Sequence, residues 1–173
     1  MKILIGLGNP GEEYENTYHN VGQLALLALA RATGKAATWK KHKNLFEYAE
    51  INDEVFARPL AYMNESGKAA QEMLKKFKAK PENLIVLQDD SDITIGDYKI
   101  SYARSSAGHK GVQSIIDTLK TNAFSRIRIG IRPAREKLRQ KAGEFALKQI
   151  TKNNMALFEK VFDAVIGDKQ TSS

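Results

Sequence analysis

The chain of 173 residues contains no cysteine and no long apolar run. Without cysteine it can hold no disulfide scaffold, no thiolate zinc site and no cysteine nucleophile. Its longest apolar stretch, residues 24–30, is far shorter than the ~18 residues that a membrane-spanning helix needs. The N-terminus lacks the small-residue cleavage site that follows the apolar segment of a secretory signal. These absences predict a cytoplasmic protein with no membrane association.

The composition is that of one soluble globular domain. Hydrophobic residues make up 42% of the chain and charged residues 27%, and the length fits a single domain of ordinary size. The sequence shows neither an internal repeat nor a linker. We therefore expect one domain over residues 1–167, followed by a frayed C-terminal tail at 168–173.

The charge balance is strongly basic. Lysine and arginine number 27 against 20 acidic residues, which gives a formal net charge of +7. Residues 126–152 carry a net charge equal to that of the whole chain, from two acids and nine cations: Arg126, Arg128, Arg132, Arg135, Lys137, Arg139, Lys141, Lys148 and Lys152. This concentration favours a polyanionic partner, most commonly nucleic acid. A solvated basic face without a partner is the alternative.

Apolar spacing predicts an alternation of strands and helices. Strands are expected at residues 2–7, 45–51, 55–60, 84–87, 98–102 and 127–131. Helices are expected at residues 21–33, 66–77 and 112–119, and from about 153 onward. Gly34 should end the first helix and Ser66 should cap the second. The order predicts the α/β class, with helices on both faces of a sheet.

The first strand is followed by a glycine pattern that spells G-x-G-x-x-G over residues 6–11. Such a pattern is typical of dinucleotide-binding folds, where pyrophosphate lies at a helix N-terminus. Here three carboxylates follow directly, at Glu12, Glu13 and Glu15, and the ribose-binding acid expected ~20 residues further on is missing. We therefore interpret the segment as a tight turn that presents Asn9.

Polar side chains follow several of the expected strands, where open α/β sheets place their sites. They are Asn9, His19, Asn64 and the acidic residues 89–92. A histidine base, a carboxylate that orients it and amides that hold a carbonyl suit the hydrolysis of an ester or amide. Each has a plainer interpretation: a packing histidine, turn asparagines, or carboxylates that bind Mg²⁺. The residues alone indicate a possible hydrolase that acts on a polyanion.

Five segments together resemble the bacterial peptidyl-tRNA hydrolase family. Residues 3–22, ILIGLGNPGEEYENTYHNVG, are similar to its N-terminal signature. Further matches follow in order over nearly the whole chain: YMNESG at 62–67, DDSD at 89–92, GHKG at 108–111 and RIRIGI at 126–131. The resemblance implies one twisted mixed sheet with helices on both faces. It also implies a monomer that cleaves the ester between a peptide and the 3′ end of tRNA.

The resemblance assigns roles to the strand-end residues. It implies that His19 is the general base that activates water and that Asp89 holds it. It implies that Asn9 recognises the first carbonyl of the peptide, which separates blocked from free aminoacyl-tRNA, and that Asn64 positions substrate and water. No metal or cofactor is expected.

Further residues match positions that bind the tRNA end. Tyr14 and Tyr62 correspond to aromatic residues that line the site, Met63 supports that wall, and Arg128 matches a cation that clamps a phosphate. The stretch from 135 to 154 is our candidate for a lid over the peptide channel.

Two positions depart from the family pattern. Lys110 stands where the family usually has asparagine, and it is expected either to lower the pKa of His19 or to reach a phosphate. Ser101 stands where a second clamping cation is common, and Lys99 or Arg104 could replace that cation. These departures motivate an alternative function, an RNA-binding module on the same fold that has lost hydrolysis.

Overall fold

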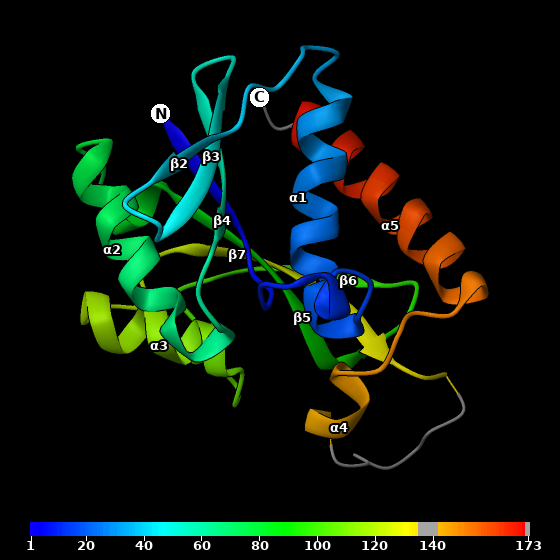
Figure 1. The fold of residues 1–173 in the computed structure, drawn as a ribbon. Coiled ribbons are helices and arrows are strands. Elements are labelled where there is room, and N and C mark those ends of the chain that lie inside the picture. The colour runs from blue at the N-terminus through cyan, green and yellow to red at the C-terminus, as the bar shows by residue number, and fades with distance from the viewer. Residues whose placement is uncertain (135–141, 172–173) are drawn as a thin grey trace.

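The computed structural model describes residues 1–134 and 142–171, in which one sheet lies between two layers of helices. Helices α1 (Val21–Ala32) and α5 (Lys152–Thr171) cover one face, and α2 (Ser66–Lys76) and α3 (Lys110–Leu119) cover the other (Figure 1). The short helix α4 (Ala142–Ala146) lies at one end of the sheet. The α/β class with helices on both faces is confirmed.

The sheet of the described residues has seven strands in the order β2-β3-β4-β1-β5-β7-β6. Their bounds are Lys2–Gly6 for β1, Lys40–His42 for β2, Phe46–Ile51 for β3, Glu54–Pro59 for β4, Leu84–Thr94 for β5, Tyr98–Tyr102 for β6 and Ser125–Arg132 for β7. Strand β1 runs parallel to β4 and β5, and β5 runs parallel to β7. Strands β2, β3 and β6 pair antiparallel, so the sheet is mixed as expected.

The central strand β1 is buried on both sides because its residues are apolar in sequence. Ile3, Leu4 and Ile5 are all 0% exposed. Leu4 packs with α1 and α5, whereas Ile3 and Ile5 pack with α2 and α3. Such a continuous apolar run is typical of a strand in the middle of a sheet. The two helix layers thus rest on opposite faces of the same short segment.

The antiparallel hairpin of β3 and β4 follows the expected turn. Asn52 and Asp53 both have positive φ, at 52° and 62°, and Ile51 pairs directly with Glu54. Two consecutive residues with positive φ form the turn type that matches the twist of paired strands, and Asn and Asp tolerate it well.

Several elements differ from the sequence-based expectation. Strand β5 continues to Thr94, so the acidic residues 89–92 lie within a strand rather than in a loop after it. Strand β2 and helix α4 were not predicted, since three polar residues and a five-residue helix carry no readable periodicity. Ser66 does not cap α2: its hydroxyl donates to the carbonyl of Met63 at 2.8 Å, and Glu65 precedes the helix.

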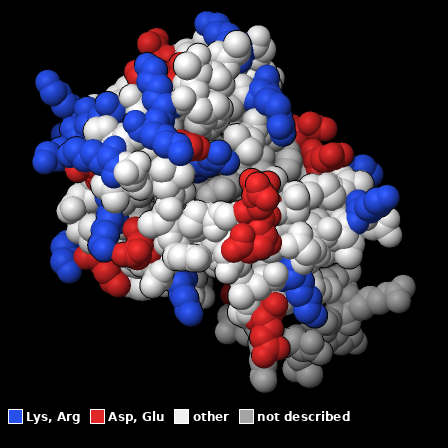
Figure 2. All heavy atoms as spheres, viewed as in Figure 1, with Lys and Arg blue, Asp and Glu red and all other residues white. Residues whose placement is uncertain are grey.

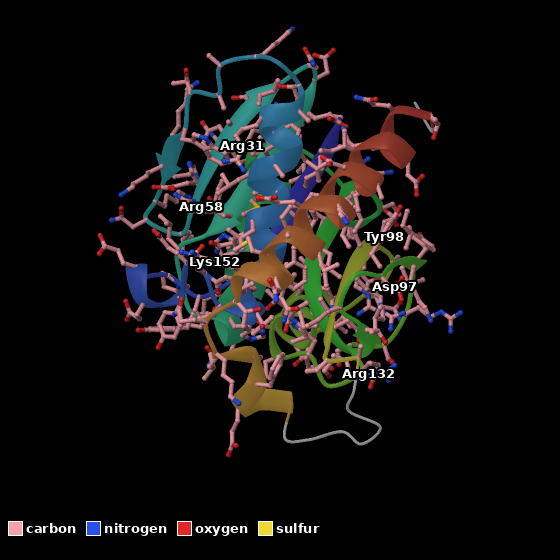
Figure 3. All side chains as sticks on the ribbon, turned by 90° about the vertical axis from the view of Figure 1, so that its right-hand side faces the viewer. Arg31, Arg58, Asp97, Tyr98, Arg132 and Lys152 are labelled. Atoms are coloured by element: carbon pink, nitrogen blue, oxygen red, sulfur yellow. The ribbon has the colours of Figure 1, made fainter. Side chains whose placement is uncertain are left out.

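The C-terminal helix also extends further than predicted. We expected the chain to fray from residue 168, but α5 continues to Thr171, and residues 172–173 lie outside the described part. Near its end the hydroxyl of Tyr98 donates to Asp168, which joins β6 to α5. Figure 3 shows α5 beside α1, with Lys152 at its first turn and Tyr98 at the start of β6. None of the helices in the described residues is long and apolar enough to cross a bilayer.

Candidate active site

The four predicted catalytic residues line one cavity of about 900 Å³. Asn9 follows β1, Asn64 follows β4, and Asp89 lies in the second half of β5. His19 belongs to a short 3-10 turn, Tyr18–Asn20, that leads directly into α1. Asn9 and Asn64 therefore lie past the carboxyl ends of neighbouring parallel strands as expected, whereas Asp89 lies inside β5 and His19 on the turn before α1.

A glycine next to this turn brings His19 against β5. A Cβ atom on Gly22 would lie 2.3 Å from the backbone oxygen of Leu87, so only glycine lets the first turn of α1 approach the strand so closely. His19 then lies beside Asp89, and its Nδ1 is 2.8 Å from Oδ2 of that carboxylate. The His19 side chain keeps 16% of its surface exposed, toward the cavity that it lines.

A second histidine bonds to the same carboxylate. Nε2 of His109 lies 2.7 Å from Oδ1 of Asp89. Nδ1 of His109 accepts a hydrogen bond from the backbone N–H of Val112 at 3.3 Å, which caps the N-terminus of α3. A nitrogen that accepts carries no proton, so the proton of neutral His109 lies on Nε2, and Nε2 donates to Asp89.

The hydrogen-bond network also assigns the proton of His19. Asp89 carries no proton, so Nδ1 of His19 donates to its Oδ2. The lone pair of neutral His19 is then on Nε2, the nitrogen not bonded to Asp89. Burial by itself lowers the pKa of His19, but the charge and hydrogen bond of Asp89 outweigh it and leave the pKa raised. Lys110 opposes that rise.

Asp89 is ionised because both of its neighbours stabilise the charge. Burial alone would raise the pKa of this carboxyl, which is 6% exposed. The charges and hydrogen bonds of His109 and His19 more than offset burial and hold the pKa of Asp89 well below its usual range.

Asn9 is held in a single orientation. Its backbone N–H donates to Oδ1 of Asn20 at 2.8 Å, and Nδ2 of Asn20 donates back to the Asn9 carbonyl at 2.9 Å. Oδ1 of Asn9 accepts from the backbone N–H of Met63 at 2.8 Å. The Asn9 amide oxygen is therefore engaged, and its NH₂ group remains to donate toward the cavity that Asn9 lines.

Of the predicted aromatic and sulfur positions, Tyr62 and Met63 line this cavity, and Tyr14 is joined to it through Tyr62. Tyr62 is 54% exposed, and the ring of Tyr14 meets it edge to face with centroids 6.3 Å apart. Met63 is buried and lines the cavity next to the exposed Asn64. A Cβ on Gly111 would lie 2.4 Å from the Met63 sulfur, so α3 packs tightly against this wall.

The predicted phosphate clamp lies on neighbouring strands rather than among the residues that line the cavity. Lys99 on β6 pairs directly with Arg128 on β7, so their side chains share one face of the sheet. Arg128 donates from Nε to Asp90 at 2.8 Å. The hydroxyl of Ser101 is buried without a hydrogen-bond partner among the described residues. Arg104 is exposed.

Basic charge is distributed differently from the sequence-based expectation. Arg126 is 2% exposed and donates to Gln88 and to the backbone carbonyl of Ser105, so it supports the sheet instead of a surface. Four further cations of the basic segment lie outside the described residues: Arg135, Lys137, Arg139 and Lys141. Figure 2 shows that Lys and Arg side chains also gather on the side where α2 and β2 lie.

The three groups of the network lie close enough to invite comparison with a metal site. The ligand atoms of His19, Asp89 and His109 all lie within 4.8 Å of one another. A metal on Nε2 of His109 would require a proton on Nδ1, but Nδ1 accepts from the N–H of Val112. The three side chains therefore suit two N–H···O hydrogen bonds to Asp89 better than they suit a metal ion.

Sequence reasoning missed several residues of the site. His109 was noted only within a motif, although a third histidine before a helix is a readable signal. Asn20, adjacent to His19, orients Asn9, and Gly143, Ala146 and Leu147 of the α4 region line the cavity. Part of the candidate lid, residues 135–141, lies outside the described residues. Its described part is joined to the segment before His19, because Gln149 donates to the Glu13 carbonyl at 2.9 Å.

The glycine pattern after β1 does not form a dinucleotide site. Gly11 is followed by a three-residue 3-10 turn, Glu12–Tyr14, instead of the long helix that binds pyrophosphate. The segment is a turn that presents Asn9, as we interpreted it.

Comparison with known proteins decides the family. The profile of the family described as peptidyl-tRNA hydrolase matches residues 3–171. The chain belongs to the peptidyl-tRNA hydrolase family. It is 39% identical to the peptidyl-tRNA hydrolase of Sulfurihydrogenibium sp. over 163 residues, which cover 93% of this chain and 85% of that relative. It is 44% identical to that of Alkaliphilus metalliredigens over 133 residues, covering 76% and 72%.

The fold agrees with a solved member of the peptidyl-tRNA hydrolase family. The crystal structure of the enzyme from Acinetobacter baumannii matches with a TM-score of 0.87 at 27% identity, covering 96% of this chain and 85% of that one. The chain is therefore an enzyme with peptidyl-tRNA hydrolase activity, and the pair of His19 and Asp89 is consistent with a catalytic histidine held by a carboxylate.

Proposed function

We propose that the chain cleaves the ester between a peptide, or an N-blocked amino acid, and the 3′ end of tRNA by direct attack of water, with His19 as general base. One observation carries this proposal: Asp89 binds Nδ1 of His19, which leaves the basic Nε2 to a cavity large enough for the end of a substrate. The ester is already activated, so an oriented water suffices without a nucleophilic side chain.

The protons balance over the reaction. Nε2 of His19 takes a proton from water as the water oxygen bonds to the ester carbonyl carbon. Asp89 stabilises the imidazolium that results. When the tetrahedral intermediate collapses, the ester bond breaks and His19 returns the proton to the ribose oxygen that leaves. The products are tRNA with a free hydroxyl and a peptide with a free carboxyl group.

Asn9 and Asn64 would position the substrate. The orientation of Asn9 supports its role, since an NH₂ group is the donor that a peptide carbonyl requires. An aminoacyl-tRNA with a free amino group lacks that carbonyl, which gives a physical basis for discrimination. Asn64 lines the cavity and has no hydrogen bond to another described residue, so its amide is available to the ester or to water.

The surrounding residues would hold the tRNA end. Tyr14 and Tyr62 offer flat surfaces on which a base can stack, and Met63 lines the cavity beside Tyr62. Lys99, Arg128 and Lys110 would contact phosphates, which makes binding tolerant of sequence and sensitive to salt. We keep the cytoplasmic location, the monomeric state and the single domain over residues 1–167 as predictions.

The test is hydrolysis of an N-acetyl-aminoacyl-tRNA beside the same tRNA with a free amino group, in the presence of a chelator. We expect cleavage of the blocked form alone. Replacement Asn9→Asp should abolish this preference, because a carboxylate repels the carbonyl that the amide binds, whereas Asn122→Asp is a control at an exposed amide of another loop. Binding of tRNA without cleavage of either form would contradict the proposed function.

A further inference from the structure

Lys110 is the one cation among the described residues that line the cavity. It is the first residue of α3, and its side chain is exposed. It makes no hydrogen bond or ion pair with another residue in the described part of the chain. In contrast, Arg128 is bonded to Asp90 at 2.8 Å. Lys110 therefore carries a positive charge into the cavity without a counter-ion from residues 1–134 or 142–171.

This charge acts on the proposed general base. Within the described residues, the charges that shift the pKa of His19 come from Asp89 on β5 and Lys110 at the start of α3, and the ring of His109 lies 5.2 Å from that of His19. Asp90, the next acid that lines the cavity, is paired with Arg128. Asp89 favours the protonated imidazole, and Lys110 disfavours it and lowers the pKa of His19. The two effects oppose each other in the free protein.

We propose that Lys110 binds a phosphate of the substrate tRNA and, through that contact, makes His19 a stronger base in the complex than in the free protein. The proposal rests on the proposed function, because the peptidyl-tRNA supplies the phosphate. A phosphate paired with Lys110 neutralises the ammonium, and the field that opposes protonation of His19 is removed. Asp89 then acts alone, and Nε2 of His19 takes the proton of water more readily.

Lys110 is thus a positioning residue that touches RNA and acts on the reaction through His19. This arrangement couples recognition to chemistry. A substrate that brings no phosphate to Lys110 would meet a weaker base, so the cation would favour RNA esters over small esters of the same peptide.

The experiment measures kcat and KM for an N-acetyl-aminoacyl-tRNA over a range of pH and salt concentration, with the full chain. Lys110→Met removes the charge at similar length, and Lys110→Arg keeps it. Lys120→Met is the matched control, because Lys120 is an exposed lysine just past the other end of α3, about 15 Å along the helix axis. Melting temperatures of all variants check that the fold is intact.

For the wild type, the pKa from the profile of kcat, which reports the complex, should lie above the pKa from kcat/KM, which reports the free protein. In Lys110→Met the two pKa values should become equal, because the pKa from kcat/KM rises. It should also make the slope of log(kcat/KM) against log salt shallower by about 0.7–0.9, the loss of one phosphate contact. Lys110→Arg and Lys120→Met should keep the gap, and Lys110→Arg should keep the slope.

Three results would overturn the inference. An unchanged slope in Lys110→Met would show that no phosphate binds there. An altered slope with an unchanged gap would show that binding is not linked to His19. Equal pKa values for kcat and kcat/KM in the wild type would remove the effect itself. In each case hydrolysis of the blocked substrate by the wild type still stands as the separate test of the proposed function.

Discussion

The network around Asp89 and the edge of the sheet at β6 and β7 are both built from charged and polar side chains, but they are organised differently. Around Asp89 each carboxylate oxygen has one donor, and the three side chains are at most 16% exposed. At the edge, Lys99 is exposed and makes no hydrogen bond or ion pair with a described residue, and Arg128 is bonded to the buried Asp90.

The difference indicates how each region contributes. A buried, fully paired network fixes proton positions, and a change in any member alters chemistry. Exposed cations each contribute a small and roughly additive amount to binding affinity, and this contribution depends on the salt concentration. We therefore expect large changes of turnover from the first region and modest changes of affinity from the second.

The largest expected effect comes from His19→Ala. Turnover of the blocked aminoacyl-tRNA should fall by about 10²- to 10⁴-fold, because the general base is lost. Affinity for deacylated tRNA should stay close to that of the wild type, since His19 is not among the phosphate contacts. Single-turnover hydrolysis and a filter-binding assay measure the two quantities. Undiminished turnover would show that another group is the base.

His109→Asn removes the hydrogen bond of residue 109 to Asp89 but keeps a side chain that can cap α3. Asparagine is a favourable N-cap, so α3 keeps its capping residue, but its shorter side chain cannot reach Asp89. Loss of one hydrogen bond to a charged group, worth about 1.5–3 kcal/mol, should reduce kcat by roughly 10- to 100-fold. The melting temperature should fall as well, because the buried carboxylate of Asp89 loses one of its two donors. Wild-type kcat in this variant would mean that Asp89 needs only His19.

Two variants that each remove one positive charge compare Arg128 with Lys99 at the edge of the sheet. In Arg128→Gln and in Lys99→Gln, the slope of log KM against log salt concentration should become shallower by about 0.7–0.9. Only Arg128→Gln should also destabilise the fold, by about 1–3 kcal/mol, since it leaves the buried carboxylate of Asp90 without its ion pair. Chemical denaturation checks the second statement. Equal stability of both variants would indicate that the ion pair is lost or compensated in solution.

The smallest expected effect is the pH dependence of stability. The lowered pKa of Asp89 stabilises the fold above 3.8, the unfolded value, and this contribution is lost as the pH falls through the lower folded value. The raised pKa of His19 stabilises the fold below 6.5 and is lost as the pH rises through the higher folded value. Thermal melting of the wild type should show both losses, and His19→Ala should lack the alkaline one.

The sequence predicted the main elements because their patterns are local. The apolar run of β1, the helix that begins at Val21 and the turn at Asn52 follow from neighbouring residues. A general rule about strand ends led us to expect Asn9 and Asp89 together, and they do line one cavity, although Asp89 lies inside β5. The roles of the site residues came from the family resemblance, not from the pattern.

The parts of the fold and site that were not predicted depend on contacts between residues far apart in the chain, which no local pattern indicates. His109 reaches Asp89 across 20 residues, and its proton position depends on a backbone N–H at the start of α3. Arg126 is counted as surface charge in the sequence but is buried against Gln88. The acidic residues of β5 bond to side chains of other elements, Asp90 to Arg128 and Asp89 to His19. Each of these features depends on two residues that are distant in sequence and meet only in the folded structure.

The most direct test of His19 as general base is the side-chain nitrogen NMR spectrum of the full chain, recorded above the pH at which His19 loses its proton. We expect opposite tautomers for the two histidines that share Asp89: a proton on Nδ1 of His19 and on Nε2 of His109. A proton on Nε2 of His19 would contradict it, because the nitrogen assigned to water would then be a donor and could not act as the base.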